Sequence, residues 1–317
     1  MTQQNRDKNS TELLVRRGAV AIPFSRGILA RSLLKLGLDS TRAHDIATRL
    51  HDELSAQGIT SVSCEHLARI ISERLSAHAG AEIAARYEQL RLFKRSDRPL
   101  VLLVGGSTGS GKSTLATEVA HRLDITRILS TDSIRHVMRS MVSERLLPSV
   151  HRSSFEAWRD TSLVRAPGVD PTLAAFLEQV QHVAVAVEAV LERAVQENLS
   201  TILEGVHLMP GLFQRFACEP RLQFLHLVVH VADETAHRQR FVERSRGVAA
   251  RPGRRYLEHF PAIRTIQGYL VEKAHTERLP CIENRDFDAT VHATLGHVLD
   301  GVGESTPVVL RPSRPYS

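Results

Sequence analysis

The chain of 317 residues has few of the features that mark exported, membrane or metal-binding proteins. Its three cysteines form no pair and no metal-binding spacing, which is typical of proteins kept in a reducing cytoplasm. No apolar run approaches the ~20 residues of a membrane span. The polar N-terminus lacks the apolar core of a signal peptide. We therefore expect a cytoplasmic protein with no membrane partner.

Aromatic residues are also scarce, at 5% of the chain. Proteins that bind single-stranded nucleic acids stack bases on aromatic side chains, so nucleic acid is not an expected partner. The net charge of +6 still favours an anionic partner, and a small phosphorylated substrate would satisfy it. With 42% hydrophobic and 24% charged residues, the composition is that of an ordinary soluble protein.

One motif dominates the sequence. Residues 105–114 read GGSTGSGKST and match G-x-x-x-x-G-K-[ST], the phosphate-binding P-loop or Walker A motif. An apolar run at 100–104 predicts a buried strand before the loop, and 114–123 predict an amphipathic helix after it. Strand, loop and helix start would direct backbone N–H groups at a polyphosphate. The residues predicted to bind ATP are Gly106, Ser107, Thr108, Gly109, Ser110, Gly111, Lys112, Ser113 and Thr114. Lys112 would reach the outer phosphates and Ser113 would bind Mg²⁺.

The pattern of apolar residues predicts two folded parts between flexible ends at 1–10 and 303–317. Residues 11–79 predict a small, mainly helical domain with a hairpin at 13–24 and three helices. Asp39 or Ser40 would cap the second helix and Ser63 the third. Residues 80–99 predict a connecting helix and a turn. Residues 100–302 alternate strands and helices, which indicates an α/β fold with the doubly wound parallel sheet of P-loop NTPases.

A P-loop alone does not distinguish kinases from other nucleotide-binding proteins. The absence of N-K-x-D argues against guanine specificity. A small-molecule kinase needs an acidic group near the acceptor hydroxyl, a cationic clamp for the substrate, and arginines over the transferred phosphate.

Two segments that follow predicted strands offer the acidic group and the clamp. Asp132 could accept the acceptor's proton or bind Mg²⁺ through water, and Arg135 could hold a carboxylate or phosphate. The alternative is that Asp132 caps a helix whose Arg135 is solvated. Glu204 could orient Mg²⁺ or water, and His207 could bind substrate or be a buried, hydrogen-bonded histidine.

The third need could be met by an arginine-rich segment. Arg240 and Arg244 share a helix face with His237 and are predicted to stabilise the transferred group. The arginines that follow within a Gly- and Pro-containing stretch are Arg246, Arg251, Arg254 and Arg255. Such a segment resembles a closing lid, although a solvated basic face has the same pattern. Asn284, after the last strand, is a weaker candidate for a contact with adenine.

Together these stretches resemble the 2-phosphoglycerate kinase family. The matching pieces are the P-loop, LSTDSIR at 129–135, SFEAW at 154–158, ILEGVHL at 202–208, the face 237–244, and 263–270. The resemblance covers about residues 100–284. It implies ATP-dependent phosphoryl transfer to the 3-hydroxyl of 2-phosphoglycerate, which gives 2,3-bisphosphoglycerate. The phosphate and carboxylate of that substrate would be held by Arg135 and the lid arginines.

The N-terminal part is similar to the ATP-cone, a nucleotide-sensing regulatory module. VRRG at 15–18, PF at 23–24 and SL at 32–33 stand where that module has its hairpin and first helix. Arg17 stands where an acidic residue often precedes the hairpin glycine. The alternative is a stabilising or dimerising helical extension, which leaves a homo-oligomer open.

Two other functions stay open at this point. One is a P-loop kinase of another small molecule or of a polynucleotide end. The other is a non-catalytic nucleotide sensor with a degenerate kinase domain, which the intact Lys112, Ser113 and Asp132 disfavour.

Overall fold

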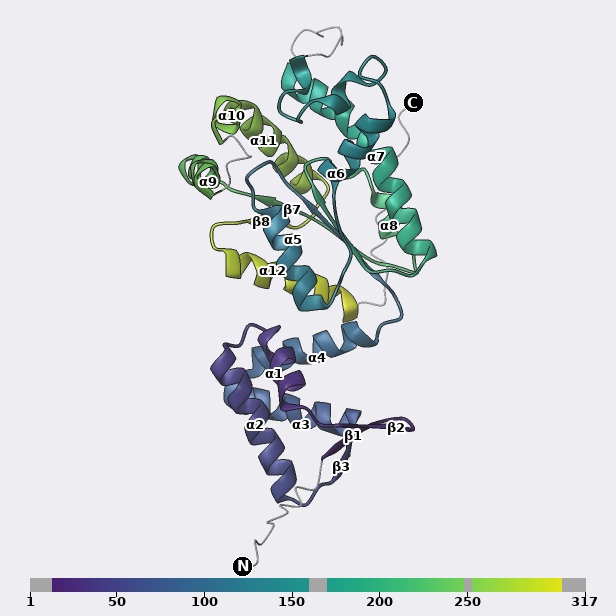
Figure 1. Ribbon diagram of the computed structural model, residues 1–317, viewed down its shortest axis with the longest axis vertical. Helices are drawn as coiled ribbons and strands as arrows, with labels where there is room; N and C mark the ends of the chain where they lie inside the picture. Colours follow the sequence, from purple (N-terminus) through teal and green to yellow (C-terminus); the bar gives the residue numbers. More distant parts are fainter. Residues whose placement is uncertain (1–12, 160–169, 248–252, 304–317) are drawn as a thin grey trace, which may run out of the picture. The chain divides into compact units, whose positions relative to one another are not determined.

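The computed structural model describes residues 13–159, 170–247 and 253–303 (Figure 1). The chain divides into two compact units, one ending at Arg95 and one beginning at Ser96. The helix expected to be a connector, α4 (Ala81–Arg95), belongs to the first unit, where it packs against α3 (Cys64–Ala79). The ends predicted to be flexible, 1–10 and 303–317, lie outside the described residues apart from Gly303.

The first unit combines a small sheet with helices. Strands β1 (Leu14–Arg17) and β2 (Val20–Pro23) form the expected antiparallel hairpin, which turns at Gly18 with φ 61°. Strand β3 (Ser61–Ser63) pairs parallel to β1 and was not predicted, because three residues are too few to show a period. Helices α1 (Arg26–Leu34) and α2 (Ser40–Ala56) complete the unit with α3 and α4.

The predicted caps of this unit are present. The Asp39 carboxylate accepts a hydrogen bond from the Arg42 N–H at 2.9 Å at the start of α2. The Ser63 hydroxyl accepts one from the His66 N–H at 3.1 Å at the start of α3. Each cap satisfies a backbone donor that has no partner within the helix.

The second unit is built on a parallel sheet in the order β5-β6-β4-β7-β8. The helices around this sheet are visible in Figure 1, and together they confirm the predicted α/β fold. The P-loop strand β4 (Leu100–Gly105) lies at the centre, between β6 (Thr201–Gly205) and β7 (Gln223–His230). The outer strands are β5 (Ile128–Ser130) and β8 (Cys281–Glu283). Every residue of β4 is buried, so the strand is covered on both faces.

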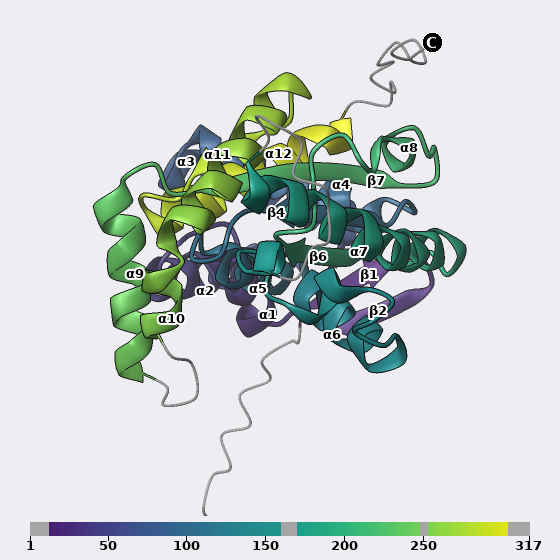
Figure 2. The same cartoon turned by 90° about the horizontal axis from the view of Figure 1, so that it is seen from above.

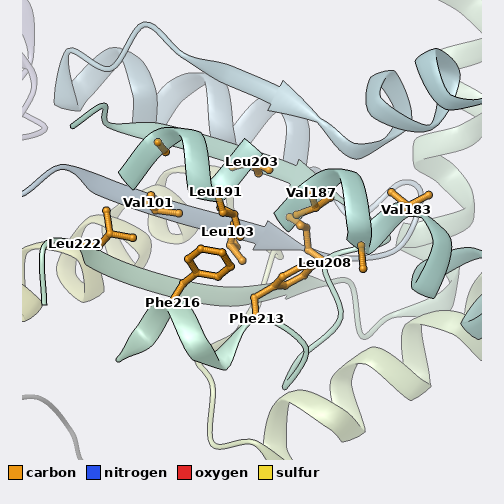
Figure 3. Packing of buried hydrophobic residues seen from close by; sticks show 12 residues of the cluster. Val101, Leu103, Val183, Val187, Leu191, Leu203, Leu208, Phe213, Phe216 and Leu222 are labelled. Carbon is orange, nitrogen blue, oxygen red and sulfur yellow. The ribbon is translucent and has the colours of Figure 1, made fainter. Parts of the chain in front are cut away.

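Helices cover both faces of this sheet. Helices α5 (Lys112–Leu123) and α12 (Phe287–Gly303) pack together, whereas α7 (Pro171–Gln196) and α11 (Phe260–Thr276) contribute to the opposite core. Another core cluster brings Val101 and Leu103 of β4 together with Val187 and Leu191 of α7 (Figure 3). The remaining elements are α6 (Thr131–Met141), η1 (Pro148–His151), η2 (Ala157–Arg159), α8 (Gln214–Ala217), α9 (Glu234–Gly247) and α10 (Gly253–Glu258). Helices α9 and α10 lie side by side (Figure 2).

Helix α7 is a long and apolar helix of the second unit. Among the described residues it is long and apolar enough to cross a membrane, by length and composition alone. Its Phe176, Val180, Val183 and Val187 are fully buried in the second unit. A core helix of a soluble protein passes the same test, because one apolar face already raises its mean hydropathy.

Candidate active site

The P-loop depends on its glycines for both conformation and packing. Gly106, Gly109 and Gly111 have φ of 155°, 84° and 92°, which side chains rarely allow. A Cβ at Gly109 would lie 2.6 Å from the Phe241 ring, and one at Gly106 would lie 2.8 Å from the Ser110 hydroxyl. The loop therefore adopts a shape that only this glycine pattern permits.

Side chains that are distant in sequence bind the carbonyl groups of the loop. His237 Nε2 lies 2.8 Å from the Thr108 carbonyl oxygen. Arg240 Nη1 and Asn284 Nδ2 both donate to the Ser110 carbonyl oxygen, at 3.1 and 2.8 Å. These contacts fix the loop from α9 and from the end of β8.

These contacts change the roles predicted for two residues, Arg240 and Asn284. Arg240 also donates to the Asn284 carbonyl oxygen, so its guanidinium supports the loop, and the structure does not bear out a role on the transferred phosphate. Asn284 is buried and accepts from the Thr290 hydroxyl at 3.2 Å, so it supports the loop too, and its contact with adenine stays a prediction. Arg244 lies in α9, but its side chain is outside the described residues.

The other arginines predicted in this segment lie in different surroundings. The side chain of Arg246 and the whole of Arg251 lie outside the described residues. Arg254 is 91% exposed and pairs with Glu258 at 3.1 Å, as a solvated basic face would. Of the two whose side chains the structure describes, Arg254 and Arg255, the second reaches the candidate site.

The sheet brings an acid to the P-loop lysine. Lys112 opens α5, and its Nζ lies 3.8 Å from Glu204 Oε2 near the end of β6. Both side chains are nearly buried, at 12% and 10% exposure. Ser113 is exposed in the first turn of α5. The structure thus joins Lys112 and Glu204 at the carboxyl edge of the sheet, as the pattern of strands predicts.

Asp132 stands at the start of α6 but does not cap it. The Ser130 hydroxyl accepts from the Ser133 N–H at 3.0 Å and takes the cap role, so the alternative interpretation of Asp132 is wrong. The Asp132 carboxylate is 63% exposed, and Arg135 Nε lies 3.5 Å from it. It is therefore available to a ligand.

The charges around Asp132 keep it ionised. Desolvation raises its pKa, but His207, Lys112 and Arg135 together lower the pKa below its ordinary value of 3.8. Burial in turn lowers the pKa of His207 to about 4, so this histidine is neutral at neutral pH. Lys112 and Arg135 are therefore the cations that act on Asp132 under those conditions.

His207 is the buried, hydrogen-bonded histidine of the two alternatives. It is fully buried. Nδ1 lies 2.8 Å from the Thr131 hydroxyl and Nε2 lies 2.9 Å from Gln179 Oε1. Both ring nitrogens are thus engaged inside the protein, and that His207 binds substrate stays a prediction.

Arg135 borders a basic cavity of about 520 Å³. Its guanidinium donates to the carbonyl oxygens of Val150 and Arg152, at 2.8 and 2.9 Å, so it is not solvated and mainly holds the cavity wall. The residues that line the cavity are Arg135, Arg139, His151, Arg152, Ser153, Glu156 and Arg255. Four arginines around one cavity make a site for an anion.

A buried acid lies within this cationic cavity. Glu156 is 5% exposed and forms an ion pair with Arg255 of α10. Its other oxygen lies 3.0 Å from His259 Nε2. Arg255 also donates to the Ser153 hydroxyl at 3.2 Å. The cluster fixes Arg255 against the segment that forms the wall.

Comparisons with known proteins show which proteins this chain is similar to. A family model described as an AAA domain matches residues 101–264. The 2-phosphoglycerate kinase of Methanopyrus kandleri is 39% identical over 278 residues, covering 87% of this chain and 84% of that protein. The chain belongs to the 2-phosphoglycerate kinase family. The family's protein from Pyrococcus furiosus is 39% identical over 289 residues, covering 91% and 93%. That from Thermococcus kodakarensis is 40% identical over 286, covering 90% and 96%.

Membership of the 2-phosphoglycerate kinase family confirms the predicted resemblance, and the residues present fit the ATP and Mg²⁺ that a P-loop kinase uses. The glycines at 106, 109 and 111 leave room for a polyphosphate to approach the backbone. Lys112 and the exposed hydroxyl of Ser113 stand in the first turn of α5. No cluster of three acidic, histidine or cysteine side chains that could hold a metal occurs in the described parts of the chain.

Sequence reasoning missed several site residues of this kinase. Gln179 lies in the middle of a long apolar helix and looks like part of its polar face. Arg139, His151 and Arg152 follow no strand, and no motif marks them. A signal for Arg139 existed: it lies four residues after Arg135, so both occupy one face of α6.

Proposed function

We propose that this protein transfers the γ-phosphoryl group of ATP, with Mg²⁺, to the 3-hydroxyl of 2-phosphoglycerate, giving 2,3-bisphosphoglycerate. The observation that carries the proposal is the basic cavity that begins at Arg135, one helical turn from the exposed carboxylate of Asp132. A phosphate and a carboxylate on one small molecule match such a cavity, and the relatives named above are 2-phosphoglycerate kinases.

The residues divide the work between the two substrates. The loop N–H groups and Lys112 bind the phosphates of ATP, and Ser113 binds Mg²⁺. Arg139, Arg152 and Arg255 hold the anionic groups of the acceptor. Positive charge fixed in place stabilises the charge that spreads over the phosphoryl oxygens during transfer.

Asp132 serves the acceptor hydroxyl. As the hydroxyl oxygen bonds to the γ-phosphorus and the bond to the leaving ADP breaks, the hydroxyl proton passes to the Asp132 carboxylate. The low pKa of Asp132 makes it a weak base, which suits a transition state in which the proton leaves late. Glu204 keeps Lys112 extended along the end of β6.

Assay of ADP formation with a panel of acids tests the proposal. The panel contains 2-phosphoglycerate, 3-phosphoglycerate and glycerate, and the product is identified by phosphorus NMR. We expect turnover of 2-phosphoglycerate with a new phosphate ester at C3. Robust turnover of another acid, with none of 2-phosphoglycerate, would exclude this substrate.

For the first unit we propose an ATP-cone-like role in nucleotide binding. A cavity of about 380 Å³ within this unit combines cations with an apolar floor. Its lining is Arg17, Cys64, Glu65, Leu67, Ala68, Ile71, Tyr87, Arg91, Lys94 and Arg95. Cationic residues beside aliphatic and aromatic ones suit a ligand with phosphates and a flat apolar base.

Calorimetric titration of the full chain with ATP tests this second proposal. Lys112→Met is introduced first, to weaken binding at the P-loop. We expect remaining ATP binding that Arg17→Ala removes. Arg49→Ala is the matched control, because Arg49 lies in the same unit, pairs with Asp45 and does not line the cavity. Equal binding in the two double variants would rule out this cavity.

A further inference from the structure

Two side chains hold one wall of the basic cavity by donating hydrogen bonds to its backbone carbonyl groups. Arg135 binds the carbonyl oxygens of Val150 and Arg152 from α6. From α7, Gln179 Nε2 donates to the carbonyl oxygen of Arg152 at 3.0 Å and, at a short distance, to that of Ser149. Two side chains thus fix the segment 149–152, which carries His151 and Arg152 into the cavity.

Gln179 also connects this wall to the residue beside Asp132. Since its amide nitrogen donates to two carbonyl oxygens, its Oε1 faces His207 and accepts from Nε2 at 2.9 Å. His207 Nδ1 must then accept from the Thr131 hydroxyl, at 2.8 Å. A single hydrogen-bonded chain therefore runs from Thr131, the residue before Asp132, to the cavity wall.

Every member of this chain is removed from solvent. Thr131, Gln179 and His207 are all fully buried. Water is not available to replace a lost partner, so a missing donor or acceptor leaves a buried polar group unsatisfied. Only an amide both donates to two carbonyl oxygens and accepts from a neutral imidazole, and asparagine is one methylene too short to span the same groups.

We propose that Gln179 is a positioning residue for the acceptor. Through His207 and Thr131 it fixes the position of the cavity wall relative to Asp132. This inference rests on the proposed acceptor site. Gln179 does not line the cavity, so its effect reaches the substrate through the wall. The side chains that contact the carbonyl groups of the P-loop are His237 and Arg240 of α9 and Asn284, and none of them belongs to this hydrogen-bonded chain. Loss of Gln179 therefore disturbs the acceptor and spares ATP.

The test compares Gln179→Glu with Gln181→Glu in the full-length enzyme. Both changes introduce the same acid in α7, but Gln181 is exposed. For Gln179→Glu we expect kcat/KM for the acceptor to fall about 10- to 100-fold, as for a displacement of up to 1 Å, with the KM for ATP unchanged. Gln181→Glu should keep both values.

A second variant and a spectroscopic readout cover the case in which Gln179→Glu folds poorly. Thr131→Val keeps the side-chain shape and removes the donor to His207, so it should also lower kcat/KM for the acceptor while leaving the KM for ATP unchanged. In ¹⁵N NMR spectra, His207 should be the neutral Nε2–H form in the wild type and protonated at neutral pH beside a carboxylate at 179.

The outcomes separate this inference from the proposed function. Folded Gln179→Glu and Thr131→Val enzymes with an unchanged kcat/KM for the acceptor would overturn the positioning role, and so would equal losses for ATP and acceptor. If the wild type phosphorylates a different acid, the proposed substrate fails, and the same comparison is made with that acid.

Discussion

Gly205→Ala should damage the kinase through one steric contact. Gly205 ends β6 and lies against Thr131, the first residue of α6. A Cβ at Gly205 would lie 2.7 Å from the Thr131 Cβ and 2.8 Å from its Cγ2, and nearer still to its hydroxyl. Carbon atoms prefer about 3.5–4.0 Å, so α6 must move by about 1 Å. Rotation of the Thr131 side chain cannot relieve the contact, because its Cβ is fixed to the backbone.

This displacement should lower both the stability of the protein and its kcat. Overpacking of a tight interior costs about 1–3 kcal/mol, which lowers the melting temperature of a domain of this size by about 2–12 °C. Because Asp132 follows Thr131 directly, a shift of about 1 Å should lower kcat roughly 100-fold. Gly205 does not have a positive φ, so the backbone itself tolerates alanine.

The measurement pairs Gly205→Ala with Gly268→Ala. A Cβ at Gly268 in α11 would meet nothing within 4 Å. This control should keep its activity and become slightly more stable, by about 0.5–1 kcal/mol, as alanine favours helix. Melting temperature and kcat are measured for both. A Gly205→Ala enzyme with wild-type kcat would refute the reasoning that this contact positions Asp132, even if its melting temperature fell.

Three further predictions concern single groups of the site. Asp132→Asn should lower kcat by about 10²- to 10⁴-fold with little change in the KM for ATP, and steady-state kinetics at saturating ATP check this. Burial lowers the pKa of both His207 and His226 to about 4, so only the unfolded state gains these protons as the pH falls from 6.5 to 4. The unfolding free energy should decline as the pH falls through that window, on the order of 3 kcal/mol for each histidine. Urea unfolding at several pH values measures it, and an unfolding free energy that does not change between pH 6.5 and 4 would contradict the burial effect. Glu156→Gln should loosen Arg255 and change the acceptor KM more than the KM for ATP, and equal changes in both would contradict the assignment of Arg255 to the acceptor.

The sequence was sufficient for the parts of the fold that have a strong local signal. The P-loop, the strand before it and the capped helices α2 and α3 were predicted because glycine spacing, apolar runs and cap residues act over a few neighbouring positions. The sequence also placed Lys112, Asp132 and Glu204 at one edge, since parallel strands end together.

The roles of Arg240, Asn284 and His207 could not be predicted in the same way. A basic residue near a phosphate site can bind the ligand or the loop that binds the ligand, and the two cases share one sequence pattern. For Arg240 the answer depends on where α9 packs against the Ser110 carbonyl group, which is a contact between residues 130 positions apart. His207 was left with two alternatives for the same reason, because only tertiary packing shows that its ring is buried.

The carbonyl groups of Thr108 and Ser110 are bound by His237, Arg240 and Asn284 in the protein alone. Fixing the backbone of one residue costs about 1–2 kcal/mol of conformational entropy. Because the loop is already ordered in the folded protein, nucleotide binding does not have to order it. Nucleotide affinity should therefore depend on how α9 and the segment after β8 pack against the loop. A natural variant that loosens either region would act as a nucleotide-binding defect while leaving the Walker A motif intact.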